Sequence, residues 1–86
     1  MTDIDKIARI TKEIREEQAP YFSTDEIFYY LEKNGGDVDA TIYELLLIKS
    51  EDSTISVSGL NTADTSGYFK RLASRYRSFN TGVLQG

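Results

Sequence analysis

The stretch from Phe22 to Leu47 contains a helix start, a helix stop and a second helix start in close succession. Ser23 followed by Glu26 forms a capping box, in which the serine oxygen accepts a backbone amide and the glutamate reaches back to the cap. Asn34-Gly35-Gly36 ends the helix because glycine tolerates the left-handed backbone of a C-terminal cap. Asp37 then serves as the next N-cap. These signals predict an α-helical hairpin.

The amino-acid composition excludes most catalytic chemistry. The 86 residues include no cysteine and no histidine, which removes the thiol nucleophile, the commonest general base and the commonest metal ligands. We therefore expect a protein that is not an enzyme and that holds no metal and no cofactor. No apolar run approaches the ~18 residues of a membrane span, and no signal-peptide pattern opens the chain. These features predict a soluble protein of a reducing cytoplasm.

Apolar residues recur at helical spacing in four segments of the chain. In the first segment Ile4, Ile7, Ile10 and Ile14 share one face, and Pro20 marks the point by which the helix has stopped. In the last segment the apolar positions are Phe69, Leu72, Ala73 and Tyr76. The patterns predict helices over about 3–18, 24–33, 38–50, and from Thr62 or Asp64 to Phe79.

The connection from Lys49 to Gly67 differs from the rest of the chain. It is rich in serine and threonine, and at about 18 residues it is long for a compact domain. We therefore predict one all-α domain over 1–86, with a three-helix core and a fourth, C-terminal helix after a long flexible loop. The corresponding segments are a core over 1–50, a loop over 51–67, a helix over 68–79 and a disordered tail over 80–86.

Several residues are candidates for a surface that binds partners. Leu45 to Ile48 are four consecutive apolar residues, more than one helix face can bury against the first two helices. The aromatic cluster between Tyr21 and Tyr43 is dense, so one or two of its rings should be exposed. Residues 1–60 carry 13 acids and 6 bases, whereas residues 61–86 carry 1 acid and 4 bases. The predicted assembly surface comprises Ile55, Val57, Leu60, Leu47, Ile48, Tyr29, Arg71, Arg75 and Arg77.

Aromatic and basic residues alternate in Tyr68-Phe69-Lys70-Arg71 and in Arg75-Tyr76-Arg77. This combination can stack on bases and contact phosphates, so it is compatible with nucleic-acid binding. Because Phe69 and Tyr76 belong to the apolar stripe, we expect the arginines to form a basic ridge for an acidic protein surface instead. That surface would belong to a partner or to a neighbouring copy of the chain.

The layout resembles that of small helical head–tail connector proteins of tailed bacteriophages and prophages. The resemblance rests on FSTDEIFYYLEKNGGDVDATIYELLL, on ISVSGLNTADTSGYF and on the closing YFKRLASRYR, and it covers about 22–77. It implies a non-enzymatic protein that forms a ring of copies beneath the portal protein and contacts other neck and tail proteins. DNA would pass through as cargo only, and no membrane would be involved. The protein would occupy the host bacterial cytoplasm during assembly and the virion neck afterwards.

A second resemblance is to the three-helix ubiquitin-associated and CUE-like modules. Pro20, Ile27, Leu31, Gly36-Asp37-Val38 and Leu45-Leu46 fall at spacings similar to those of that family, over about 27 residues. The chain departs from the family where a CUE domain carries Met-Phe, because Ala19 precedes Pro20 here. This resemblance implies a protein-binding module with ubiquitin contacts around Pro20–Tyr21 and Leu45–Lys49.

Overall fold

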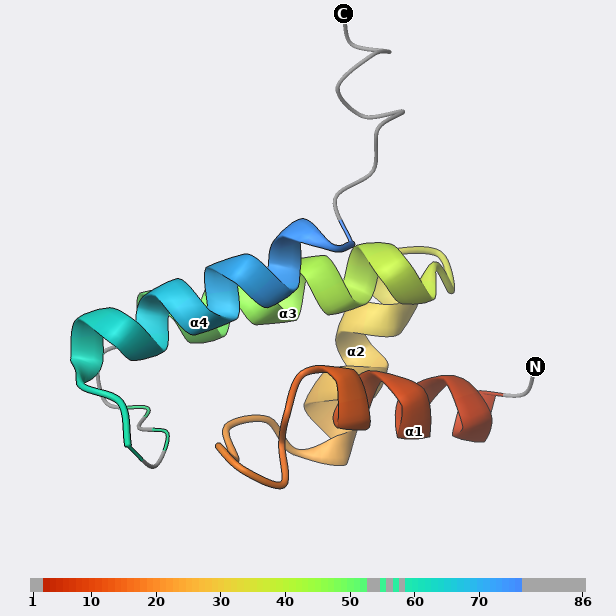
Figure 1. Ribbon diagram of the computed structural model, residues 1–86. Helices are drawn as coiled ribbons and strands as arrows, with labels where there is room; N and C mark the ends of the chain where they lie inside the picture. Colours follow the sequence, from red (N-terminus) through yellow and green to blue (C-terminus); the bar gives the residue numbers. More distant parts are fainter. Residues whose placement is uncertain (1–2, 53–54, 56, 58, 77–86) are drawn as a thin grey trace, which may run out of the picture.

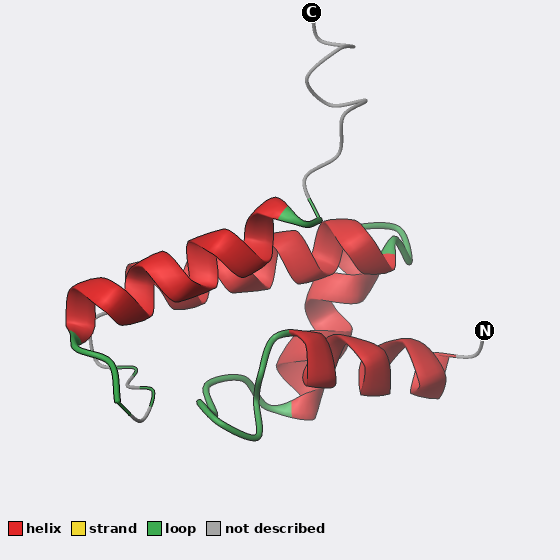
Figure 2. Cartoon of the chain, viewed as in Figure 1, coloured by secondary structure: helices red, strands yellow, loops and turns green. Residues whose placement is uncertain are grey.

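The computed structural model describes residues 3–52, 55, 57 and 59–76, and this part of the chain contains four α-helices and no strand (Figure 2). The all-α class predicted from the sequence is confirmed. Within the same described part, no helix combines the length and the apolar character that crossing a membrane requires. The helices are α1 (Asp3–Glu13), α2 (Thr24–Lys33), α3 (Val38–Glu51) and α4 (Thr62–Ser74).

Helices α3 and α4 lie side by side, and α2 crosses between α3 and α1 (Figure 1). The contact between α3 and α4 is the most extensive in the structure. Phe69, Leu72 and Ala73 of α4 belong to the same buried cluster as Leu45 and Leu46 of α3. Helix α4 therefore explains the apolar excess of α3, which it covers within one molecule.

Both ends of α2 form as the sequence predicts. The Ser23 side chain accepts a hydrogen bond from the Glu26 amide, and the Glu26 carboxylate accepts one from the Ser23 amide. After the helix, Gly35 adopts a φ of +65°, and the amide of Gly36 donates to the carbonyl of Leu31. Asp37 caps α3 by accepting from the amide of Ala40. Local hydrogen bonds thus set these boundaries.

The predicted extension of the first helix to Gln18 is wrong, because α1 ends at Glu13. The amide of Arg15 donates to Lys12 O, and the amide of Glu16 donates to Thr11 O. This is the Schellman arrangement of a helix C-terminus, with Arg15 at the left-handed position. Ile10 and Ile14 are buried as predicted, whereas Ile4, the first member of the stripe, is 78% exposed.

The connection before the last helix is shorter than predicted. Asn61 is the N-cap of α4, and its side chain accepts from the amide of Asp64. Helix α4 therefore begins at Thr62, the earlier of the two predicted starts, and residues 62–67 are helical rather than loop. The predicted continuation of this helix to Phe79 is wrong, because α4 ends at Ser74 and the amides of Arg75 and Tyr76 donate to Leu72 O and Ala73 O in a turn. The predicted tail over 80–86 lies outside the described residues.

Candidate functional site

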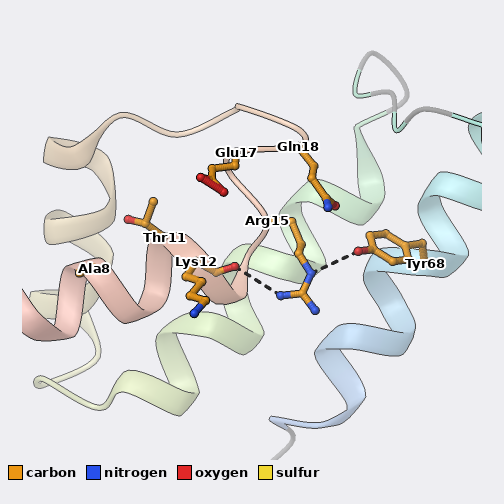
Figure 3. A pocket seen from close by; sticks show the side chains of 7 residues that line it. All are labelled: Ala8, Thr11, Lys12, Arg15, Glu17, Gln18 and Tyr68. Atoms are coloured by element: carbon orange, nitrogen blue, oxygen red, sulfur yellow. Dashed lines mark hydrogen bonds between the residues drawn. The ribbon is translucent and has the colours of Figure 1, made fainter.

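A groove of about 820 Å³ opens between the C-terminal end of α1 and the side of α4 (Figure 3). In the described part of the chain, no Cα atom of α1 comes within 8 Å of one in α4, so side chains bridge the two helices. One bridge joins Arg15 to Tyr68, and a second runs from the Tyr76 hydroxyl to the Glu13 carboxylate. The groove is lined by Ala8, Thr11, Lys12, Arg15, Glu17, Gln18 and Tyr68.

Arg15 is the most unusual residue of the groove. Its φ of +62° makes it the one described residue other than glycine with a left-handed backbone. Its Nε donates to the Tyr68 hydroxyl at 3.2 Å, and its Nη1 donates to the Lys12 carbonyl at 3.4 Å (Figure 3). The corresponding position at the end of α2 is Gly35. Sequence reasoning missed this site because no glycine or asparagine marks the end of α1.

Lys49 of α3 binds the loop after α1, which carries several residues of the groove. Its side chain has no exposed surface, and its Nζ donates to Ile14 O, Ala19 O and Glu16 Oε2, each at 2.7 Å. Burial lowers the pKa of Lys49, and the neighbouring Glu16 carboxylate offsets part of that lowering. The ammonium also lies 5.0 Å from the centroid of the Phe69 ring, a cation–π distance. Lys49 thus connects the loop after α1 to α4.

Glu16, in the same loop, binds the backbone just before α2. Its Oε1 accepts from the amides of Tyr21 at 2.8 Å and of Phe22 at 2.9 Å, while its Oε2 accepts from Lys49. Among the described residues, no buried side-chain polar atom lacks a hydrogen-bond partner. The hydrogen bonds of Glu16 tie the loop that carries Arg15, Glu17 and Gln18 to the start of α2 and to Lys49 of α3.

Next to the groove, α4 carries two exposed arginines. Arg71 and Arg75 follow Tyr68 at i+3 and i+7, on the same side of the helix, and both are exposed. Within the described part of the chain, no ion pair joins Lys12, Arg15 or either of these arginines to a carboxylate. Glu17 is the one acid in the lining. We define the basic groove as Lys12, Arg15, Tyr68, Arg71 and Arg75.

A second surface of opposite charge lies on α2. Tyr29 is 61% exposed, and its ring packs edge-on against Tyr30 at a centroid distance of 5.2 Å. Tyr30 in turn contacts Phe22 at 6.0 Å. Asp25 and Glu32, four residues before and three after Tyr29, are exposed on the same side of α2. We define the acidic tyrosine face as Asp25, Tyr29 and Glu32.

The exposed aromatic rings expected from the sequence are Tyr29 and Tyr21, which is 41% exposed. Hydrogen bonding to Asp52 raises the pKa of the Tyr21 hydroxyl, with smaller contributions from burial and nearby acids. These rings mark the end of α2 and the loop before it as an accessible aromatic surface.

The other residues of the predicted assembly surface are dispersed. Ile55 is 7% exposed and belongs to the core, so an interface built on its side chain is not available in this structure. Leu47, Ile48, Val57 and Leu60 are half-buried. Arg71 and Arg75 are exposed as predicted, and Arg77 lies outside the described residues. The candidate site is therefore the groove between α1 and α4 rather than the predicted loop.

The described residues contain no group of three or more acidic side chains placed to hold a metal ion. Comparison of the chain with known protein families, with curated proteins and with solved structures finds no match.

Proposed function

We propose that the chain is a non-enzymatic assembly protein of a phage or prophage particle, a head–tail connector that lies beneath the portal. Copies would form a ring in the virion neck, with the portal and other neck or tail proteins as partners and DNA as passing cargo. The observation that carries the proposal is Arg15, held in a left-handed backbone with its guanidinium in the basic groove.

The backbone at Arg15 is costly for a residue with a Cβ atom. A left-handed conformation costs roughly 1–2 kcal/mol for such residues, and glycine would remove most of that cost. Strained positions of this kind gather at sites where the side chain has a role. The role open to Arg15 is recognition, because its planar guanidinium suits carboxylates and aromatic faces.

The other groups in and below the groove also support binding rather than catalysis. The Thr11 hydroxyl donates to Ile7 O at 2.8 Å, so its hydrogen is already used within α1. Lys49, the amine with a lowered pKa, is fully buried and donates to three oxygens, which leaves no path to a substrate.

Only part of the surface that the ubiquitin-binding alternative requires is accessible, namely Pro20 and Tyr21, which are both exposed. The alternative also requires contacts around Leu45–Lys49, but Leu45, Leu46 and Lys49 have no exposed surface. Helix α4 packs along α3 in this region, so a partner docking there would have to displace α4. The connector proposal uses surfaces that are already accessible.

The proposal is tested in the genome that encodes the chain. Inactivating the gene should leave filled heads and separate tails, visible by electron microscopy, and a wild-type copy supplied in trans should restore joined particles. Arg15→Gly should fail to restore them although it folds, with an unfolding free energy within about 1 kcal/mol of wild type because backbone relief offsets the lost contacts.

Gly35→Ala provides the matched control at the end of α2. Gly35 has the same left-handed backbone, so alanine there should destabilise the fold by about 1 kcal/mol without touching the groove. We expect this variant to join heads to tails as wild type does. Normal tailed particles in the absence of the gene would contradict the proposed function.

A further inference from the structure

We propose that the basic groove of one copy receives the acidic tyrosine face of the next copy, in a head-to-tail contact. The inference rests on the proposed function, and it names a second copy of the chain as the occupant of the groove.

The two surfaces are complementary in charge and similar in chemistry. Lys12 and Arg15 line the groove beside Tyr68, and Arg71 and Arg75 are exposed on the same side of α4 as Tyr68. None of these four bases has a carboxylate partner among the described residues. The acidic tyrosine face presents Asp25 and Glu32 on either side of an exposed Tyr29. Lys33, an exposed base four residues after Tyr29 on the same side of α2, is paired with Glu44 at 2.6 Å, so the unpaired charges beside Tyr29 are acidic. An exposed tyrosine beside such acids is a good anchor for a basic surface, because tyrosine and arginine dominate interface energetics.

The groove has the size for such an anchor. Its volume of about 820 Å³ lies within the range of pockets that enclose small ligands, roughly 300–1,000 Å³. Tyr29 projects from α2 with 61% of its surface exposed, and the Tyr30 ring supports it at 5.2 Å. An aromatic ring that is already held in place loses little conformational entropy on docking.

The positions of the surfaces determine the kind of assembly. Helices α2 and α4 both pack against α3, but in the described part of the chain they make no contact with each other. Helix α1, which with the loop after it lines most of the groove, packs against α2, but none of the lining residues belongs to the acidic tyrosine face, so the two surfaces share no side chain. A contact between two different surfaces is heterologous, and it generates a ring when its rotation closes.

Neighbouring residues on α4 supply a matched test of the groove. Arg71 and Lys70 are both exposed and carry the same charge, but Lys70 points away from the side that holds Tyr68 and Arg75. In sedimentation velocity over a concentration series, Arg71→Glu should weaken self-association of the full chain at least ~10-fold, because it places like charges in contact. Lys70→Glu should leave the association within about twofold of wild type.

Charge exchange tests the pairing itself. One variant carries Lys12→Glu with Arg71→Glu, and the other carries Asp25→Lys with Glu32→Lys. Each variant alone should remain monomeric, because the reversed side chains place like charges between its two surfaces, although Arg15 and Arg75 are kept in the groove. An equimolar mixture should assemble, since each surface again meets its opposite and the copies alternate. Failure of the mixture to assemble, when wild type does, would overturn the inference.

Cross-linking extends the test to association too weak to sediment. The chain has no cysteine, so Glu32→Cys on one copy and Arg71→Cys on another can be joined only through the introduced thiols. A short bis-maleimide should link these two variants at least about fivefold faster than Glu32→Cys with Lys70→Cys, as expected for neighbours held at high effective concentration. Equal rates for the two pairs would overturn the inference.

A different occupant of the groove would give a different result. If Arg71→Glu abolishes binding to a DNA duplex and leaves self-association unchanged, the groove is a phosphate site and the inference is overturned. Failure of the proposed function is separate, because it is judged by whether particles form without the gene. A chain that joins heads to tails but associates through other residues would retain the function and lose the inference.

Discussion

At the scale of single residues, Lys49 is the clearest case of burial compensated by hydrogen bonds. A lysine ammonium has three donors, and here two carbonyls and one carboxylate accept all of them at 2.7 Å. Removing a charge from water costs several kcal/mol unless the charge is paired and hydrogen-bonded. The site meets both conditions, so the loop after α1, helix α3 and helix α4 share one polar anchor.

Lys49→Met should therefore destabilise the fold strongly. The substitution leaves the Glu16 carboxylate without its cation and leaves Ile14 O and Ala19 O without their donor. We expect the free energy of unfolding, measured by urea denaturation, to fall by about 3–5 kcal/mol. Lys70→Met, an exposed change on α4, should alter it by less than about 0.5 kcal/mol. Equal effects of the two substitutions would show that the buried network contributes nothing.

The contribution of Lys49 to stability should also depend on pH. Because burial lowers the pKa of Lys49, the unfolded chain binds this proton more tightly than the folded chain does. The contribution of Lys49 to the unfolding free energy should then rise as pH increases from the lowered pKa towards the ordinary value near 10.5. The measurement is the difference between wild-type and Lys49→Met stability across that range. A difference that falls with pH would contradict the assignment.

At the scale of elements, the segment between α3 and α4 belongs partly to the core. Ile55 is 7% exposed, although its flanking sequence is polar and the segment reads as a flexible loop. Its amide donates to Asp52 O at 3.3 Å, directly after the end of α3. The Ile55 side chain therefore anchors the connection between α3 and α4 in the hydrophobic core.

Ile55→Ser should destabilise the monomer, contrary to what an exposed assembly loop would show. Loss of a buried isoleucine costs about 2–5 kcal/mol, and we expect a decrease of that size in the unfolding free energy. Ile4→Ser makes the same chemical change at a residue that is 78% exposed, so it should have an effect below about 0.5 kcal/mol. Thermal denaturation of both variants measures the contrast; equal melting temperatures would place Ile55 outside the core.

At the scale of the whole molecule, the four helices share one hydrophobic cluster. Ile10 and Ile14 from the α1 region, Ile27 and Leu31 from α2, Leu45 and Leu46 from α3 and Phe69 and Leu72 from α4 all belong to it. Small domains with a single core usually unfold in one cooperative step. Helix α4 should therefore unfold together with the first three helices.

Phe69→Ala tests whether α4 unfolds together with the other three helices. Phe69 has no exposed surface and lies against the Lys49 ammonium, so its truncation should cost about 3–5 kcal/mol. Helix content followed by circular dichroism and tyrosine fluorescence should still report a single transition at a lower denaturant concentration. An early loss of helix content with tyrosine fluorescence unchanged would show that α4 unfolds on its own. Lys70→Ala serves as the neighbouring control, with an expected effect below about 0.5 kcal/mol.

The features that the sequence predicts correctly depend on residues close together in the chain. The capping box of Ser23 and Glu26, the glycine cap at Gly35 and the Asp37 cap each join residues no more than about four or five positions apart. Such bonds are largely independent of the rest of the fold, so α2 matches its predicted range and α3 differs by one residue. The all-α class follows from the same local signals and from helical periodicity.

The candidate site depends on contacts that no local pattern contains. The bond from Arg15 to Tyr68 spans 53 positions, and those from Lys49 to Ile14 and Ala19 span 35 and 30. Helix α1 ends at Glu13, and no glycine or asparagine follows it to mark that end in the sequence. The packing of α4 on α3 decides that Arg71 and Arg75 remain exposed. The sequence by itself determined the presence of the four helices and three of their caps. Tertiary packing decided the groove, because a groove is formed by side chains that meet only after distant helices pack together.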